Sequence, residues 1–267
     1  MPMYAGLDIG SRTTKAAIFD DNDRFVWTII DTEPEIELTA KKVFSRVMDK
    51  AGVSTKDVAG TVATGYGRVV VSFAHSVTEI SCHARGAVYF NPEIRLILDV
   101  GGQDSKAIRC NQEGKVTAFA LNEKCAAGTG RYLERVAETL GIPLEQIGPL
   151  SLKATQPVEI SSFCAVFAQN EVVSLLRSGK PLSDILAGAC YATIRRQVPL
   201  LKKVGLEGGT LMFCGGVAKN AGAVKVLEEQ VGMKAYIPPE PQIVGAVGAA
   251  LIARERARKG QPVVILP

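Results

Sequence analysis

The sequence predicts an α/β protein that consists of two lobes with a duplicated core. Three observations support this fold class. Apolar runs typical of strands alternate with segments of helical periodicity along the chain. A motif of strand, tight turn and strand occurs twice. The length of 267 residues suffices for two domains of ordinary size.

The repeated motif reads LDIGSRTTKAAI at residues 7–18 and LDVGGQDSKAIR at residues 98–109. Identical Leu, Asp, Gly, Lys and Ala residues recur at a constant offset of 91 residues, so that Asp8 corresponds to Asp99. Each copy leads into a polar turn and then into another apolar stretch. A match this dense predicts that a subdomain has been duplicated.

The remaining elements follow from periodicity and from turn residues. Helices are predicted at residues 37–51, 76–89, 128–140, 164–178, 182–204, 220–230 and 243–259. Strands are predicted at residues 57–64, 210–214 and 235–237. Pro199 is expected to strain the long helix that contains it. We expect a first lobe over residues 1–93, a second over 94–242, and a final helix at 243–259 that packs back on the first lobe.

The composition excludes several classes of function. The net charge is only +4, and the basic residues are scattered among acids, which argues against nucleic-acid and membrane-surface binding. No segment approaches the roughly 18 apolar residues of a spanning helix. The N-terminal segment lacks the pattern of a signal peptide, so a cytoplasmic location is expected. The six cysteines are then not expected to form disulfides.

The two repeated turns have the chemistry of phosphate-binding loops. A glycine in such a turn lets the backbone approach a ligand closely, and the hydroxyl and ammonium groups that follow can bind phosphate oxygens. The candidate phosphate-binding residues are Gly10, Ser11, Thr13, Thr14, Lys15, Gly101 and Gly102. Two ordinary hairpin turns are the alternative, but their repetition in register favours phosphate binding. The chain has no GxxxxGK[ST] motif, which excludes a P-loop protein.

Four residues of these turns are candidates for catalysis. Asp8 and Asp99 end the two strands, and paired carboxylates can hold a hydrated Mg²⁺ ion between the lobes. Gln103 or Asp104 is expected to position an attacking water molecule.

A third glycine-rich turn, CGGVAKN at residues 214–220, follows an apolar strand and opens a helix. Its glycines allow a flat ligand such as adenosine to lie against the backbone. The candidate residues are Gly215, Gly216, Lys219 and Asn220. The alternative is a plain strand-to-helix turn.

Two cysteines lie at the starts of predicted helices. Cys125 is in NEKCAAGTGR, and Cys164 is in EISSFCAVFA. Helix N-termini favour thiolates and anions, so both residues are candidate ligands of an iron–sulfur cluster, which a two-fold dimer would complete. Spacing alone favours two core cysteines instead. The other four, Cys82, Cys110, Cys190 and Cys214, are expected to be buried.

The adjacent Cys82 and His83 raise a further alternative. A paired cysteine and histidine can act in nucleophilic catalysis. Because the predicted helix around them is mostly apolar, a core histidine with satisfied hydrogen bonds is the favoured interpretation.

Taken together, these motifs resemble one family. The chain resembles the activator component of 2-hydroxyacyl-CoA dehydratases, in the wider BadF/BadG/BcrA/BcrD-like ATPase family that also includes ATP-binding subunits of benzoyl-CoA reductases. The matching stretches are GLDIGSRTTK at 6–15, ATGYGR at 63–68, EISCHARGA at 79–87, LDVGGQDSK at 98–106, NEKCAAGTGR at 122–131, EISSFCAVFAQNE at 159–171, GGVAKN at 215–220 and GAVGAAL at 245–251. KCAAGTGR and ISS-x-C-x-VFA are the most specific of them.

The resemblance implies a two-lobed fold of the actin/Hsp70/sugar-kinase type, with a duplicated ribonuclease-H-like core. It implies a homodimer bridged by one [4Fe-4S] cluster, with Cys125 and Cys164 on the ligand positions. It also implies ATP or ADP with Mg²⁺ as cofactors, bound at the turns named above, and it adds Gly128 and Gly130 to the candidate nucleotide-binding residues.

The activity that the resemblance implies is ATP-driven electron transfer. A ferredoxin or flavodoxin would supply the electron, and a partner iron–sulfur enzyme such as a 2-hydroxyacyl-CoA dehydratase would receive it. Alternative receivers are a benzoyl-CoA reductase and a double-cubane cluster protein. Two alternatives on the same fold remain at this point. A small-molecule kinase would need a catalytic base that the sequence does not place, and a non-redox ATPase or chaperone would need neither Cys125 nor Cys164.

Overall fold

The computed structural model of the chain describes residues 1–122, 127–160 and 165–261. It divides into two compact units. Unit 1 comprises residues 1–95, 110–117 and 242–267, and unit 2 comprises residues 96–109 and 118–241. Among the described residues, no helix is long and apolar enough to cross a membrane.

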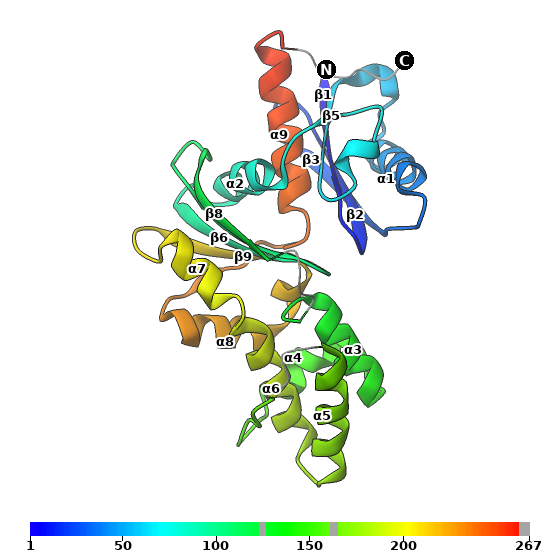
Figure 1. The fold of residues 1–267 in the computed structure, drawn as a ribbon. Helices are drawn as coiled ribbons and strands as arrows, with labels where there is room; N and C mark the ends of the chain where they lie inside the picture. The colour runs from blue at the N-terminus through cyan, green and yellow to red at the C-terminus, as the bar shows by residue number, and fades with distance from the viewer. Residues whose placement is uncertain (123–126, 161–164, 262–267) are drawn as a thin grey trace. The chain divides into compact units, whose positions relative to one another are not determined.

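Unit 1 is built on a mixed five-stranded sheet with the order β3-β2-β1-β4-β5. Strands β1, β2 and β3 are labelled in Figure 1, together with helices α1, α2 and α9 of this unit. Its strands are β1 (Met3–Ile9), β2 (Thr13–Phe19), β3 (Phe25–Asp31), β4 (Val58–Thr64) and β5 (His75–Ser76). Its helices are α1 (Ile36–Ala51), α2 (Glu79–Phe90) and α9 (Val244–Arg258), with short 3-10 turns at Thr55–Asp57 and Arg68–Val70. The first three strands are antiparallel, whereas β4 runs parallel to both β1 and β5.

Helix α9 packs within unit 1 because small residues let backbones touch. A Cβ atom on Gly6 of β1 would overlap the carbonyl oxygen of Ala246, and one on Gly86 of α2 would overlap that of Val244. A Cβ atom on Gly248 would likewise overlap the carbonyl oxygen of Cys82. The pattern VGAVGAAL therefore suits a helix pressed against both β1 and α2.

Unit 2 repeats the architecture with the sheet order β10-β9-β6-β7-β8. Its strands are β6 (Ile94–Val100), β7 (Ser105–Cys110), β8 (Val116–Asn122), β9 (Thr210–Cys214) and β10 (Ala235–Tyr236). Its helices are α3 (Gly130–Leu140), α4 (Ile147–Ser151), α5 (Ala165–Arg177), α6 (Leu182–Ile194), α7 (Val198–Val204) and α8 (Ala221–Val231), with 3-10 turns at Leu144–Gln146 and Gly216–Lys219.

The two sheets have the same strand order when β1–β5 are matched to β6, β7, β8, β9 and β10 in turn. In each sheet the strand with aspartate as its penultimate residue, β1 or β6, lies between an antiparallel neighbour and the strand that follows the helical crossover. This duplication confirms the fold class predicted from the repeated motif.

Two local features differ from the expectations. The single helix predicted at 182–204 is two helices, α6 and α7, which are separated by residues 195–197. Pro199 lies in the first turn of α7, where its missing N–H costs no hydrogen bond.

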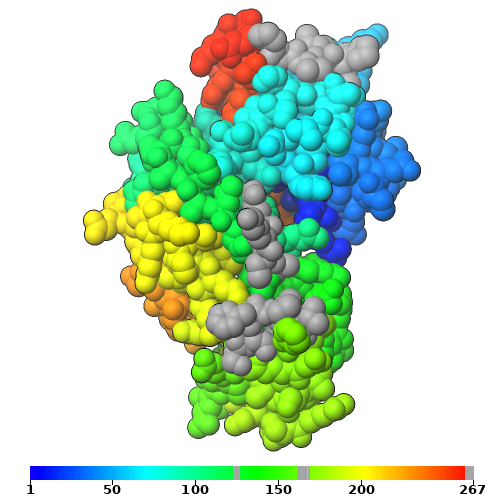
Figure 2. Space-filling model, in the orientation of Figure 1, coloured from blue at the N-terminus to red at the C-terminus, as the bar shows by residue number. Residues whose placement is uncertain are grey.

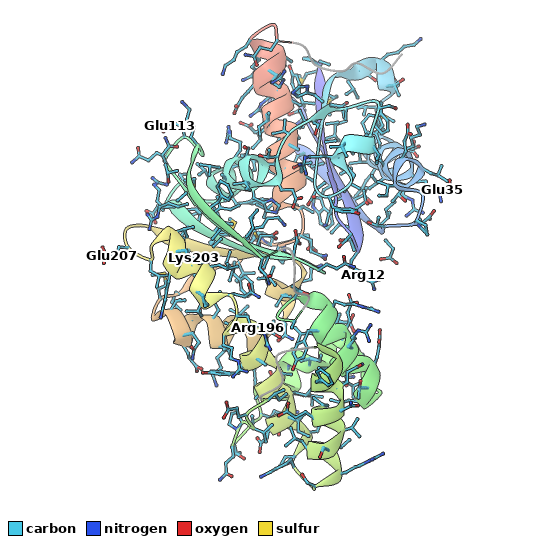
Figure 3. The ribbon with its side chains drawn as sticks, viewed as in Figure 1. Arg12, Glu35, Glu113, Arg196, Lys203 and Glu207 are labelled. Atoms are coloured by element: carbon cyan, nitrogen blue, oxygen red, sulfur yellow. The ribbon has the colours of Figure 1, made fainter. Side chains whose placement is uncertain are left out.

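The turn between β7 and β8 belongs to unit 1, although the sequence-based boundary placed it in the second lobe. The reason is close packing, because a Cβ on Gly114 would lie 3.1 Å from Cα of Arg85 in α2. This turn reaches the surface (Figure 2, green), with Glu113 at its tip (Figure 3).

Candidate functional site

Hydrogen bonds to threonine residues stabilise the turn between β1 and β2. The N–H of Gly10 donates to the carbonyl oxygen of Thr13 at 3.1 Å, which closes the turn. The hydroxyl of Thr32 donates to the carbonyl oxygen of Gly10 at 2.8 Å and lies 2.8 Å from the hydroxyl of Thr14. Thr14 is buried, so its hydroxyl supports the turn from inside the protein, whereas Arg12 is exposed at the tip (Figure 3).

Asp8 is the penultimate residue of β1, beside this turn, and is only 6% exposed. The ammonium group of Lys15 lies 3.7 Å from Oδ2 of Asp8. On the other side is Gly65, which follows β4 and has a φ of +90°. A Cβ atom there would overlap the carbonyl oxygen of Ile9 and lie 2.7 Å from Oδ1 of Asp8. Only glycine suits this position, because both its backbone conformation and the approach of Asp8 exclude a side chain.

Unit 2 repeats this arrangement around Asp99, which is 5% exposed. The ammonium group of Lys106 lies 3.3 Å from Asp99 and 2.6 Å from Asp104. Gly215, with a φ of +83°, takes the place of Gly65, because a Cβ there would lie 2.7 Å from Oδ1 of Asp99. The same aspartate–glycine contact therefore occurs once in each unit.

The site prediction did not include three residues of these arrangements. Gly65 and Lys106 occupy the positions that Gly215 and Lys15 occupy in the other unit. The constant offset of the repeat pairs Lys106 with Lys15, so Lys106 could have been predicted as a site residue from the sequence. Gly245 of α9 approaches Asp8 from a distant part of the chain, which no local pattern could reveal.

The turn between β6 and β7 is hydrogen-bonded to the start of α3. The N–H of Gly130 donates to the carbonyl oxygen of Gly101 at 2.9 Å, and the N–H of Arg131 donates to that of Gly102 at 2.9 Å. The hydroxyl of Thr129 donates to the same Gly102 oxygen at 2.9 Å. Gly130 thus contacts the turn through its backbone.

These bonds orient the turn for anion binding. In a trans peptide the C=O and the following N–H point in opposite directions, and the described chain has no cis peptide. Since the carbonyls of Gly101 and Gly102 point toward α3, the N–H groups of Gly102 and Gln103 point away from it. Two successive N–H groups on one side of a turn form a concavity suited to phosphate oxygens. The side chain of Gln103 is exposed on this turn.

Gly128 lies before α3 in a loop that the interior of unit 2 holds in place. It has a φ of +94°, and its carbonyl oxygen accepts a hydrogen bond from Nε2 of Gln197 at 2.5 Å. Gln197 is fully buried, so this loop is anchored to the junction of α6 and α7. Gly128 is therefore a structural support of the loop before α3.

The third glycine turn leads from β9 into α8. The N–H of Gly215 donates to the carbonyl oxygen of Pro241 at 2.9 Å, and Gly216 begins the 3-10 turn that follows. Asn220 caps α8 by accepting a hydrogen bond from the N–H of Ala223 at 3.0 Å. Lys219 forms an ion pair of 2.8 Å with Glu240. Both side chains therefore have structural contacts at the edge of this turn.

The cysteines fall into two groups. Cys82, Cys110, Cys190 and Cys214 are buried, as predicted. Burial raises the pKa of the Cys82 thiol to about 12 and that of Cys190 to about 11, which opposes a nucleophilic role for Cys82. Cys125 and Cys164 lie outside the described residues.

Comparison with known proteins decides the family. The family model described as "BadF/BadG/BcrA/BcrD ATPase family" matches residues 5–253. The chain belongs to this family. A relative in Anaerotignum propionicum, the activator of lactoyl-CoA dehydratase, is 40% identical, with 96% of this chain and 100% of the relative covered.

Solved structures agree with this membership in the BadF/BadG/BcrA/BcrD ATPase family. The activator of the 2-hydroxyisocaproyl-CoA dehydratase from Clostridium difficile, solved with bound ADPNP, superposes with a TM-score of 0.91 at 35% identity. That match covers 97% of this chain and 96% of the other. A ROK hexokinase from Thermus thermophilus has a TM-score of 0.55 at 18% identity over 97% of this chain and 100% of that one, which supports the fold alone. The predicted ATPase-family enzyme with an actin-like fold is confirmed.

Proposed function

We propose that the protein is an ATP-dependent reductive activator. It hydrolyses ATP and passes an electron from a ferredoxin or flavodoxin to a partner iron–sulfur enzyme such as a 2-hydroxyacyl-CoA dehydratase. A [4Fe-4S] cluster shared by two copies of the chain would supply the redox centre for this transfer, and Cys125 and Cys164 would hold it. Membership in the ATPase family and the activators among its relatives support the proposal.

The nucleotide site is proposed to use the repeated turns. Asp8 and Asp99 are buried carboxylates, and carboxylate oxygens are the donors that Mg²⁺ prefers, so the residues present fit a hydrated Mg²⁺ ion. Lys15 and Lys106, each beside one of these aspartates, supply positive charge for phosphate oxygens. Gln103 or Asp104 would orient the attacking water, and the turn at Gly215 and Gly216 would hold the adenosine.

Two cysteines of each chain are proposed to bind an iron–sulfur cluster that is shared between two chains. Iron–sulfur clusters are commonly held by four thiolates. The four described cysteines are buried in the protein interior, and burial raises the pKa of the Cys82 and Cys190 thiols. Cys125 and Cys164, which match the family's cluster-ligand motifs, are proposed as the donor set of one chain, and a second copy would complete the set of four. When bound, the cluster supplies a one-electron redox centre.

Hydrogen bonds between the β6–β7 turn and the start of α3 support the proposed coupling between nucleotide binding and the cluster. The phosphate-binding turn at Gly101 and Gly102 is hydrogen-bonded to Thr129, Gly130 and Arg131 at the start of α3. Cys125 precedes Thr129 by four residues in the sequence. A nucleotide that binds differently to two conformations of the turn can therefore shift the segment that carries a cluster ligand.

The direct test is nucleotide-dependent electron transfer to a dehydratase. The iron-loaded protein is reduced, mixed anaerobically with a 2-hydroxyacyl-CoA dehydratase, and given ATP, ADPNP or no nucleotide while dehydration is followed. We expect dehydratase activity only with ATP, and none with Cys125→Ser or Cys164→Ser protein. Phosphate transfer to a sugar or carboxylic acid without iron would instead favour a small-molecule kinase.

A further inference from the structure

Unit 1 contains an open cavity of about 730 Å³. Its walls come from α2, α9 and the turn between β7 and β8, and every residue that lines it belongs to unit 1. None of the lining residues is among the candidate nucleotide or cluster residues. The volume lies within the range of small-molecule sites, so the cavity is large enough for a small organic ligand.

Hydrogen bonds fix the β7–β8 turn, which forms one wall of this cavity. Oδ1 of Asn111 accepts hydrogen bonds from the N–H of Glu113 at 3.2 Å and from the N–H of Lys115 at 2.8 Å. The N–H of Asn111 donates to the carbonyl oxygen of Lys115 at 2.9 Å. Because Gly114 also packs closely on α2, the backbone that carries Lys115 is held in place beside that helix.

Arg85 of α2 lines the opposite side of the cavity from within unit 1. Its Nε donates to Oε1 of Glu255 in α9 at 2.6 Å, which restrains the side chain. Within the described part of the chain, Nη1 and Nη2 of Arg85 form no hydrogen bond or ion pair. These two nitrogens make up a second edge of the guanidinium group, and such an edge matches the two oxygens of a carboxylate or phosphate.

The charged residues that line the cavity have a net positive charge. Arg85 and Glu255 form an ion pair with each other. Lys115 and Lys259 are exposed and have no ion-pair partner among the residues that the structure describes. The remaining acid, Glu113, lies at the tip of the turn (Figure 3). Two lysines against one glutamate favour an anionic ligand.

The cavity also has an apolar surface. Val88 of α2 is buried, and Val116 of β8 and Ile252 of α9 are half-buried; all three line the cavity. Covering such side chains with an apolar group stabilises binding, whereas an inorganic anion gains nothing from them. A ligand with a charged head and an apolar body therefore matches both parts of the lining.

We propose that this cavity binds a small organic anion that has a carboxylate or phosphate head and a short apolar body. The guanidinium group of Arg85 and the ammonium groups of Lys115 and Lys259 are the proposed contacts of the head. The proposal is independent of the proposed electron transfer, because it uses no residue of the nucleotide or cluster sites.

The test measures the binding of hexyl phosphate to the full-length protein by ligand-observed NMR, with and without saturating ADP. Inorganic phosphate tests the contribution of the apolar body, and hexanoate tests the head. The double variant Lys115→Gln/Lys259→Gln removes both ammonium groups. Lys153→Gln/Lys180→Gln is the matched control, because these lysines are exposed in unit 2 and their substitution changes the net charge equally.

Hexyl phosphate is expected to bind the wild type about equally with and without ADP, and about tenfold more tightly than inorganic phosphate. Lys115→Gln/Lys259→Gln should weaken the binding about tenfold, as for two exposed ion pairs worth about threefold each. The control variant should bind as the wild type does. Tighter binding of hexanoate than of hexyl phosphate would assign a carboxylate head, and the reverse would assign a phosphate head.

The proposal is overturned if neither hexyl phosphate nor hexanoate binds saturably, or if ADP abolishes the binding, which would place the probe in the nucleotide site. It is also overturned if Lys115→Gln/Lys259→Gln binds as tightly as the wild type. An equal loss in the control variant would mean that general surface charge attracts the probe, and would overturn it too. Failure of iron loading or of dehydratase activation would refute only the proposed function.

Discussion

The hydroxyl of Thr129 donates a hydrogen bond of 2.9 Å to the carbonyl oxygen of Gly102. This contact joins the β6–β7 turn to the start of α3, together with two backbone bonds from Gly130 and Arg131. Thr129 is fully buried, so water cannot replace its hydroxyl as the donor to Gly102. The bond thus offers a specific place to test the proposed coupling between the turn and Cys125.

Thr129→Val should weaken this communication, because valine keeps the shape of threonine and removes the donor. Binding linkage is reciprocal, so coupling appears as a difference in ADP affinity between iron-loaded and iron-free protein. We expect Thr129→Val to reduce that difference about fivefold, corresponding to about 1 kcal/mol for one buried hydrogen bond. Fluorescent ADP titrations of both forms provide the measurement.

Thr129→Ser is the matched control, since serine retains the hydroxyl. It should keep most of the wild-type difference in ADP affinity. The coupling role of the bond would be refuted by a Thr129→Val protein whose iron-loaded and iron-free forms differ as much as those of the wild type.

Asp99→Asn should lower ATP turnover by about a hundredfold or more, because a neutral amide is a weaker ligand for Mg²⁺ and for developing charge. The substitution preserves size, so the fold should survive. Steady-state phosphate release measures the effect, and Asp49→Asn on the exposed side of α1 is the control. Wild-type rates in both Asp99→Asn and Asp8→Asn would rule out the paired-carboxylate account of the Mg²⁺ site.

Gly215→Ala should destabilise the protein by about 3 kcal/mol, since a methyl group would enter the contact with Asp99 and the carbonyl of Val100 at an unfavourable φ of +83°. Gly232→Ala isolates the backbone effect, because Gly232 has a φ of +70° and no atom within 4 Å of a built Cβ. It should cost only about 1 kcal/mol. Urea unfolding of both variants gives the comparison, and equal losses would mean that the contact with Asp99 is unimportant.

The sequence predicted much of the fold because duplication and periodicity are local signals. The offset between Asp8 and Asp99 anticipated two sheets of the same order, and the glycines after strands marked the turns. The division of the helix at 182–204 was not predictable from apolar periodicity, because residues 195–197 continue the pattern while Pro199 starts a new helix. The membership of residues 110–117 in unit 1 depends on tertiary packing of Gly114.

Native alkylation at pH 8 should separate the two groups of cysteines. With a pKa of about 12, Cys82 is almost entirely protonated at pH 8, and burial blocks access to the reagent as well. Iron-free protein should therefore be modified at Cys125 and Cys164 but not at the four buried cysteines. Peptide mass spectrometry identifies the sites, and iron loading should protect both. Rapid native labelling of Cys82 would contradict its burial.

The candidate site was less predictable than the fold. Residues within the turns, such as Asp99 and Gly101, could be predicted because the residue types and the spacing that indicate phosphate binding lie in one short segment. Thr14 was predicted to face phosphate, yet its buried hydroxyl lies beside Thr32, because alternation along β2 turns it inward. Gly245 and His83 come together only when α9 packs on α2, and no spacing in the sequence records that contact.

The most direct test of the account is the iron and sulfide content of the purified protein under anaerobic conditions. The account predicts about two iron and two sulfide ions per chain, because one four-iron cluster is shared by two chains. It also predicts their loss from Cys125→Ala and Cys164→Ala proteins that still bind ADP. A folded, ADP-binding wild-type protein with no iron after reconstitution would contradict the role in electron transfer and leave only an ATPase.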